Sequence, residues 1–338
     1  MAVLDWLLDS DPSVRWQALQ DLAGAPADVV AAERARVVAE GWGARLLALR
    51  GEDGQWSGGA YFPAQGGDSD VGPSDGADAT DSPEDSGGPE GAGEGVQPWT
   101  ATTYSLLQLR DFGVDPDSEQ MRRAVALVRD NCRWEEGGQP FFTGEVEPCI
   151  NGMAVGLGAY FGQDVNGVVA RLGNEQLDDG GWNCWAEYGA VVSSAATTIN
   201  VLEGLLAHEQ STGGSAESLE ARRRGEQYLL ERRLFRRKST GEVIDPAWLE
   251  FSFPTRWHYD VLRALEYFRS AGGPPDPRLA EAIELLRSKR QTDGTWLLEN
   301  THPGQVHFEL EDGDGRPSRW NTLRALRVLR WHQDGASP

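Results

Sequence analysis

Hydrophobic residues recur at helical spacing along most of the chain. Five segments place apolar side chains three and four positions apart, which is the spacing of one face of an α-helix. They read "TTYSLLQLRDFG", "CINGMAVGLGAYFG", "TTINVLEGLLAHE", "WHYDVLRALEYFR" and "WNTLRALRVLRW". An earlier stretch, "DPSVRWQALQDL", adds a sixth such helix, and its Asp-Pro pair favours a helix start. These similar segments predict an internal repeat of apolar helices.

More polar helices are expected between the apolar ones. They are rich in Arg and Glu, carry Asp, Ser or Pro near their starts, and include "DSEQMRRAVALVRD", "SLEARRRGEQYLLERRLF" and "DPRLAEAIELLRSKR". Each polar and apolar pair leaves an apolar flank that only a neighbouring pair covers. The predicted fold is therefore all-α: a single α/α toroid over residues 1–338, with about six inner and about six outer helices.

Turns with Gly and Trp at one spacing lead into several of the apolar segments. Three read "RGEDGQW" (50–56), "QLDDGGW" (176–182) and "RQTDGTW" (290–296), and "WEEGGQPF" (134–141) is a degenerate fourth. They resemble the QW repeats, QxxxGxW, of squalene and oxidosqualene cyclases, in the superfamily that includes terpene cyclases and protein prenyltransferase β subunits. In that family the Gln caps a helix end and stacks on the Trp ring. Gln176 and Trp182 match the pattern, whereas Arg50 and Arg290 supply a guanidinium, which also stacks on indole.

The resemblance implies a fold more than an activity. On it, Trp182 is a scaffold residue, and Asp178 and Asp179 are turn residues. Class II terpene cyclases protonate a double bond with a DxDD motif, which this sequence lacks, and it also lacks the DDxxD motif that binds magnesium and diphosphate. Ordinary squalene cyclisation is therefore not expected.

The prenyltransferase branch of the superfamily implies a zinc site. Its β subunits hold zinc with an Asp, a Cys and a His at inner helix starts, the Asp and Cys two residues apart. Here Cys149 and His258 are expected to begin apolar helices, and Cys184 follows the third turn, so these three are the predicted metal ligands. Two thiolates and an imidazole with a fourth position free suit a catalytic zinc. Lanthipeptide cyclases, similar only in architecture, use Cys, Cys and His.

Two features leave the prediction of a zinc site undecided. The segment "VVSSAAT" after the third turn has neither Asp nor Cys, so this site would be a variant of the prenyltransferase one. The alternative is that Cys149 and Cys184 are small buried apolar residues and that His258 is a hydrogen-bonded lining residue.

Other residues near the expected helix starts are candidates for the cavity. His258 and Asp260 are the predicted catalytic residues, Asp260 as a proton donor if burial raises its pKa. The alternative for Asp260 is a partner of the helix dipole. The predicted substrate-binding residues, which otherwise plug the ring, are Trp99, Trp185, Trp257 and Trp320.

A long loop precedes the last apolar helix and carries His and acidic residues. It is expected to cover the site and to bind calcium or magnesium, or else to be a solvated acidic loop. Its candidates are His302, His307, Glu309, Glu311, Asp312 and Asp314.

Charge changes this picture in one place. Nine acidic residues and no basic one fall within 65–96, which predicts a disordered acidic insert and leaves −13 of the total charge of −22 for the rest. This charge argues against nucleic-acid binding.

No apolar run is long enough to span a bilayer, and the first residues do not resemble a secretory signal. With three cysteines, an odd number, a cytoplasmic protein is expected.

Together these patterns favour an enzyme. It is expected to act on an isoprenoid or another small apolar substrate in the central cavity, with the assistance of zinc. The alternative is a non-catalytic helical ring that binds an apolar ligand or a peptide or protein partner. A third hypothesis, a lanthipeptide-like thiol cyclase, depends on the zinc.

Overall fold

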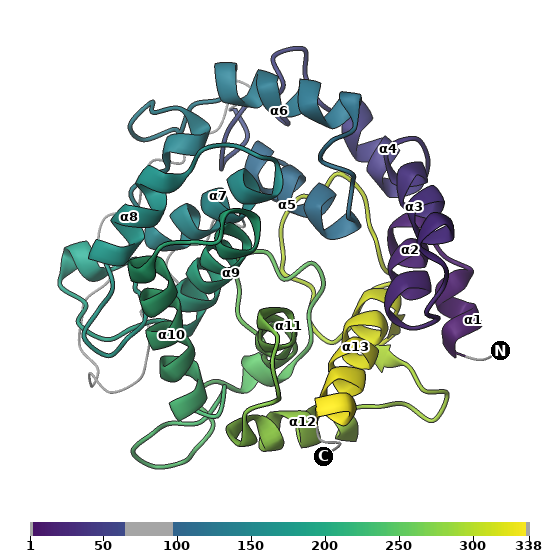
Figure 1. The fold of residues 1–338 in the computed structure, drawn as a ribbon, viewed down its shortest axis with the longest axis vertical. Helices are drawn as coiled ribbons and strands as arrows, with labels where there is room; N and C mark the ends of the chain where they lie inside the picture. Colours follow the sequence, from purple (N-terminus) through teal and green to yellow (C-terminus); the bar gives the residue numbers. More distant parts are fainter. Residues whose placement is uncertain (1–2, 65–96, 336–338) are drawn as a thin grey trace.

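The computed structural model of the chain describes residues 3–64 and 97–335, which are mostly helical (Figure 1). The α-helices are α1 (Val3–Leu8), α2 (Pro12–Asp21), α3 (Ala27–Ala35), α4 (Gly41–Ala48), α5 (Thr102–Phe112), α6 (Glu119–Asn131), α7 (Pro148–Tyr160), α8 (Asn166–Asn174), α9 (Ala195–Thr212), α10 (Ala216–Glu231), α11 (Val261–Ala271), α12 (Ala280–Ser288) and α13 (Arg319–Gly335). Two short strands, β1 (Trp296–Leu297) and β2 (Pro317–Ser318), pair antiparallel. The expected acidic insert, 65–96, lies outside the described residues. Within those residues, no helix combines the length and apolar character needed to cross a membrane.

The apolar segments form the buried helices, as predicted. In Figure 1, α6, α8, α10 and α12 lie at the periphery, and α5, α7, α9, α11 and α13 lie inside them. Nine of the eleven residues of α5 and eleven of the thirteen of α7 are buried, but only four of the thirteen of α6. The prediction of an all-α fold is therefore confirmed.

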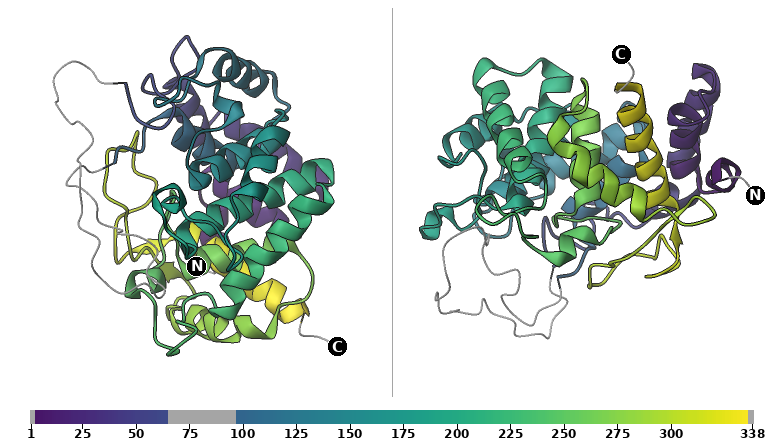
Figure 2. Two further views of the ribbon diagram at one scale, coloured as in Figure 1. Left: turned by 90° about the vertical axis from the view of Figure 1, so that its left-hand side faces the viewer. Right: turned by 90° about the horizontal axis from the view of Figure 1, so that it is seen from below.

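The two ends of the described chain pack together. Arg327 of α13 donates a hydrogen bond of 2.6 Å to Oε1 of Gln17 in α2, and it forms an ion pair of 2.5 Å with Asp21. In the right-hand view of Figure 2, many of the helices stand roughly upright, and the connection before α13 passes beneath them. The first and last buried helices are thus neighbours.

Close helix packing explains glycines in the middle of two apolar helices. A Cβ atom at Gly152 in α7 would lie 2.5 Å from the backbone oxygen of Asn200 in α9, and one at Gly204 would lie 2.2 Å from the oxygen of Gly152. Backbone atoms cannot move away as a flexible side chain can. Glycine is therefore required for α7 and α9 to approach this closely.

Each complete Gly-Trp turn joins an outer helix to the next inner helix. The indole N–H of each Trp donates to a carbonyl ten residues earlier, near the end of α4, α8 or α12. The pairs are Trp56 to Leu46 (2.8 Å), Trp182 to Leu172 (2.7 Å) and Trp296 to Leu286 (2.8 Å). The backbone N–H of the same Trp donates to a threonine hydroxyl in the next buried helix. These hydroxyls belong to Thr102, Thr198 and Thr322, at 3.2, 3.1 and 2.9 Å.

Polar side chains of the turns bond the turns to neighbouring segments. The Gln176 amide donates to the carbonyl oxygens of Gly180 (2.6 Å) and of Ala221 in α10 (2.7 Å). The carboxylate of Asp179 accepts from the backbone N–H of Ser193 at 3.0 Å, which ties the turn to the segment before α9. The Arg290 guanidinium lies 5.5 Å from the centre of the Trp296 ring.

Candidate functional site

A cavity of about 610 Å³ lies between the buried helices, and we call it the bore. It is lined by residues of α2, α5, α7, α9, α11 and α13, and by the loop segment 253–256 before α11. Along α13 the lining runs from Trp320 to Arg327. A second cavity of about 460 Å³ shares Arg327 and continues past it to Trp331 and Asp334. The bore therefore leads toward the surface at the C-terminal end of α13.

The lining of the bore is both apolar and charged. Its apolar side chains include Leu107, Met153, Leu206, Phe253 and Trp320. Its six arginines are Arg110, Arg256, Arg263, Arg269, Arg324 and Arg327, and its four carboxylates are Asp21, Asp111, Glu203 and Glu266. Arginines therefore outnumber carboxylates in a protein whose total charge is −22. Such a cavity favours ligands with a negative group.

The four tryptophans expected to bind substrate lie in different places. Of these four, and within the described residues, Trp320 alone lines the bore. Trp99 is buried and donates to the carbonyl oxygen of Pro303 at 2.9 Å. The indole of Trp257 donates to Oε1 of Gln97 at 3.0 Å, and Trp185 is 46% exposed.

Cys149 and Cys184 come together, as the sequence predicted. Cys149 lies in the first turn of α7, and Cys184 follows the turn that ends at Trp182. Their Sγ atoms are 2.8 Å apart, and Sγ of Cys184 lies 3.3 Å from the hydroxyl oxygen of Thr197 in α9. The turn and the packing of α7 on α9 thus place two thiols at one point.

The third candidate ligand beside the cysteines is Glu147. Its Oε2 atom lies 3.4 Å from Sγ of Cys149, and the ligand atoms of Glu147, Cys149 and Cys184 all lie within 4.8 Å of one another. His258, the third ligand expected from the sequence, is not in this group. We call these three residues the thiol-carboxylate group.

The thiol-carboxylate group is suited to a soft divalent cation. Contact with Cys184 and burial raise the pKa of the Cys149 thiol well above its ordinary value, and the charge of Glu147 raises it further. A nearby cation has the opposite effect and favours the thiolate. Two thiolates and one carboxylate are donors that zinc accepts, and three protein ligands leave one position for a substrate.

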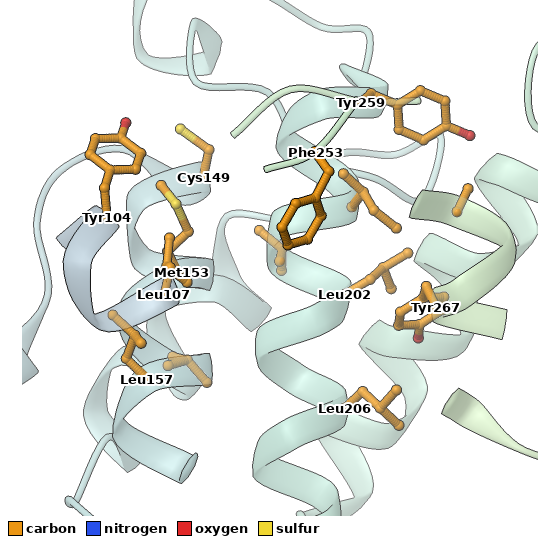
Figure 3. Packing of buried hydrophobic residues seen from close by; sticks show 14 of the residues in the cluster. Tyr104, Leu107, Cys149, Met153, Leu157, Leu202, Leu206, Phe253, Tyr259 and Tyr267 are labelled. Atoms are coloured by element: carbon orange, nitrogen blue, oxygen red, sulfur yellow. The ribbon is translucent and has the colours of Figure 1, made fainter. Parts of the chain in front are cut away.

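The thiol-carboxylate group is adjacent to the bore. Figure 3 shows Cys149 and Met153 on one helix, with Tyr104 beside them, and both Met153 and Tyr104 line the bore. Burial raises the pKa of Tyr104 well above its ordinary value, and neighbouring Tyr61 and Cys149 add to the rise. Tyr104 is therefore a neutral phenol at pH 7, near both the thiols and the cavity.

His258 lies in a loop and does not begin a helix. The prediction that it begins the apolar helix is wrong, because the Asp260 carboxylate caps α11 and the helix starts at Val261. The His258 ring stacks between Trp257 and His302, with ring centres 3.8 and 3.7 Å away. Burial lowers the pKa of His258 to about 3, and neighbouring cations and His302 contribute. Burial also lowers the pKa of His302 to about 4.

The low pKa values of these two histidines predict that the protein loses stability in mild acid. Between pH 7 and pH 5, we expect each to lower the free energy of unfolding by about 1–2 kcal/mol. Both titrate near 6.5 when unfolded but near 3 and 4 when folded, so the unfolded chain binds protons first as the pH falls. Urea unfolding at pH 7, 6 and 5 measures how steeply the free energy of unfolding falls with pH. The control is the double variant His258→Gln/His302→Gln, and an unchanged slope in it would contradict this assignment.

The contacts of Asp260 favour its structural role. Its carboxylate is buried and accepts hydrogen bonds from the backbone N–H of Arg263 (2.7 Å) and of Ser252 (3.2 Å). The Ser252 hydroxyl donates a third bond at 2.8 Å. All three acceptor contacts of this carboxylate are made within the protein, and the bond from Arg263 is that of a helix cap.

The long loop before α13 uses its polar residues for internal contacts. The half-buried Glu311 accepts from the hydroxyl of Ser318 (2.6 Å) and from the backbone N–H of Trp320 (3.1 Å), and so caps α13. The Asp314 carboxylate accepts from the Thr301 hydroxyl at 2.6 Å. His307 lies 3.1 Å from the hydroxyl of Ser105. In the described chain, the loop's acids and histidines do not gather as a set of metal ligands.

Glu147 is the candidate ligand that the sequence-based prediction missed. The signal is present in "EPCINGM", where an acidic residue precedes a cysteine by two positions at the start of an apolar helix. In the prenyltransferases, an Asp and a Cys with this spacing bind zinc. Function has to be inferred from the site itself, since a fold alone does not fix an activity. Comparison with known protein families and with curated proteins finds no match for this chain.

Proposed function

We propose that this protein is an enzyme with a single α/α-toroid fold, similar to prenyltransferases and squalene cyclases, that acts on an isoprenoid or similarly apolar substrate in the bore. A zinc ion on Glu147, Cys149 and Cys184 assists the reaction. The observation that carries this proposal is the position of the thiol-carboxylate group beside Tyr104 and Met153, which line the bore. The toroid is supported by six buried helices around one cavity and by the contact of α13 with α2.

The bore has the size and the apolar surface for such a substrate. Its volume of about 610 Å³ falls in the range of small-molecule sites. Leu107, Met153 and Phe253 offer apolar contacts near the thiol-carboxylate group, and Leu206 extends this surface along α9. These side chains offer apolar contacts to a chain that is bound in the bore.

The chain's own residues hold the metal and the substrate. When bound, zinc supplies a Lewis acid that activates a thiol or water at its open position. Glu147, Cys149 and Cys184 would hold it, and the Thr197 hydroxyl lies 3.3 Å from Sγ of Cys184. The neutral phenol of Tyr104, which lines the bore, accepts a hydrogen bond of 2.7 Å from the Gln97 amide and is also hydrogen-bonded to Tyr61.

Filling the bore tests whether the substrate binds there. Ala207 lines the bore on α9, and a larger side chain at this position occupies space that a ligand needs. We expect Ala207→Trp to weaken the binding of farnesol, measured by calorimetry, by roughly tenfold or more, because the ligand loses apolar burial. The control is Trp185→Ala, which removes an exposed indole. Equal affinity of wild type and Ala207→Trp would contradict the proposal.

One observation favours the alternative, a non-catalytic module that binds a peptide or protein. The segment after Cys184 exposes Trp185 (46%), Tyr188 (75%) and Val191 (76%), a set of apolar side chains typical of interaction surfaces. Incubation of the zinc-loaded protein with farnesyl diphosphate and a thiol peptide distinguishes the enzyme from the binding module. A prenylated or cyclised product supports the enzyme, whereas recovery of both compounds unchanged supports the binding module.

A further inference from the structure

Cys149 and Cys184 are close enough to form a bond with each other. Their Sγ atoms are 2.8 Å apart, and a disulfide places two sulfur atoms about 2.05 Å apart. Two thiolates that share one tetrahedral zinc ion, each about 2.3 Å from it, are instead about 3.8 Å apart. The separation in the structure lies between these two values. A movement of about 1 Å therefore takes the pair to either state, and the two states exclude each other.

The two cysteines lie on elements that are held in different ways. Cys149 is buried in the first turn of α7, which packs closely on α9. Cys184 lies in the loop before α9, and Asn183 closes this loop on itself. The Asn183 amide donates to the carbonyl oxygen of Val192 at 2.7 Å, and its Oδ1 atom accepts from the backbone N–H of Trp185 at 2.9 Å. A small shift of this loop can bring the two Sγ atoms together while α7 and α9 keep their packing.

The three cysteines differ in how easily an oxidant reaches them. Cys184 is partly exposed, whereas Cys149 and Cys132 are buried. Burial also raises the pKa of the Cys132 thiol to about 12, so this side chain stays a thiol at neutral pH. Oxidation of a cysteine follows its exposure and its thiolate character. Cys184 is therefore the expected site of first attack, and Cys132 is expected to be inert.

We propose that Cys149 and Cys184 form a reversible disulfide when the protein meets a peroxide, and that this modification prevents zinc binding. The inference rests on the proposed function for the zinc site that it controls. A cysteine binds zinc as a thiolate, and a disulfide has no thiolate. The modification therefore makes the occupancy of the thiol-carboxylate group depend on the redox state of its surroundings.

The oxidation consumes one peroxide and two thiols. Sγ of Cys184 attacks one peroxide oxygen, the O–O bond breaks, and the released hydroxide takes the thiol proton and leaves as water. Cys184 is then a sulfenic acid. Sγ of Cys149 attacks Sγ of Cys184, the S–O bond breaks, and the hydroxide leaves with the proton of Cys149 as a second water. The two sulfur atoms give up two electrons to the peroxide, and an external dithiol reverses the bond by exchange.

Peptide mapping of the full chain tests the disulfide. The protein is reduced, freed of metal with a chelator, treated with hydrogen peroxide, alkylated and digested with trypsin. Cys149 and Cys184 fall on separate tryptic peptides, 134–171 and 172–222. We expect these peptides to be linked within one chain, as a non-reducing gel shows, and to separate after treatment with dithiothreitol. The control variant Cys132→Ser is expected to keep the link.

Competition with a chromophoric chelator tests the effect on zinc binding. Oxidised protein is expected to bind zinc at least roughly 100-fold more weakly than reduced protein, and dithiothreitol is expected to restore the affinity. Absence of the linked peptides, or a link that involves Cys132, would overturn the inference. Linked peptides with unchanged zinc affinity would show that the disulfide does not control the zinc site. Reduced protein that binds no zinc would instead contradict the proposed function, while the linked peptides would still establish the disulfide.

Discussion

Replacing Trp182 with alanine is expected to lower the free energy of unfolding by about 3–5 kcal/mol. The side chain is fully buried, and its indole N–H donates to the carbonyl oxygen of Leu172 in α8. Gly225 of α10 lies against the ring, where a Cβ atom would be 2.8 Å away. Alanine therefore leaves a large cavity and an unpaired carbonyl where α8, α9 and α10 meet. Urea denaturation followed by circular dichroism measures the change.

Trp185 provides a matched control for this prediction. It lies three residues after Trp182, but it is 46% exposed. Trp185→Ala is expected to change the free energy of unfolding by less than about 1 kcal/mol, as is usual for surface positions. If Trp182→Ala is no more destabilising than Trp185→Ala, the turn does not hold the helices together.

The helices and turns were predictable because their signals are local. The spacing of apolar residues in "TTYSLLQLRDFG" identifies α5 almost to the residue. The spacing of Gly180 and Trp182 identifies a turn whose hydrogen bonds join α8 to α9. Such patterns depend on residues a few positions apart, so one sequence is enough to recognise them.

The charge of the bore depends on contacts between distant residues. Arg263 and Arg324 are only 5% and 7% exposed. The sequence signal for these buried cations is their position within the apolar pattern of their helices. The partner of Arg263 is Glu203, sixty positions earlier on another helix. Which arginines are paired follows only from the packing of the helices.

The members of the thiol-carboxylate group were predicted in part. Cys149 and Cys184 were identified because both lie near the start of an apolar helix or at the turn before one. Glu147 was missed because the acidic residue was sought after the third turn and not before Cys149. His258 was expected at a helix start, but the Asp260 cap delays α11 to Val261 and leaves His258 in the loop.

The second large effect is expected at the thiol-carboxylate group. Cys149→Ser and Cys184→Ser are each expected to weaken zinc binding by at least roughly 100-fold, because each removes one of three protein ligands. Glu147→Gln is expected to weaken it by about tenfold, since an amide oxygen is a poorer ligand than a carboxylate. Competition with a chromophoric chelator measures these affinities.

Two controls separate this site from the alternatives. Cys132→Ser removes the third thiol, which is buried at the end of α6 outside the thiol-carboxylate group. His258→Gln removes the imidazole expected from the sequence to bind zinc. Both variants are expected to keep the zinc affinity of wild type. A loss in His258→Gln that matches the loss in Cys184→Ser would support the ligand set predicted from sequence over the one in the structure.

The most direct test of the metal centre is the X-ray absorption spectrum of the zinc-loaded protein. We predict two sulfur ligands at about 2.3 Å, completed by oxygen or nitrogen ligands, and a loss of sulfur scattering in Cys184→Ser. A protein that takes up no zinc, or whose bound zinc has no sulfur ligands, would contradict this prediction.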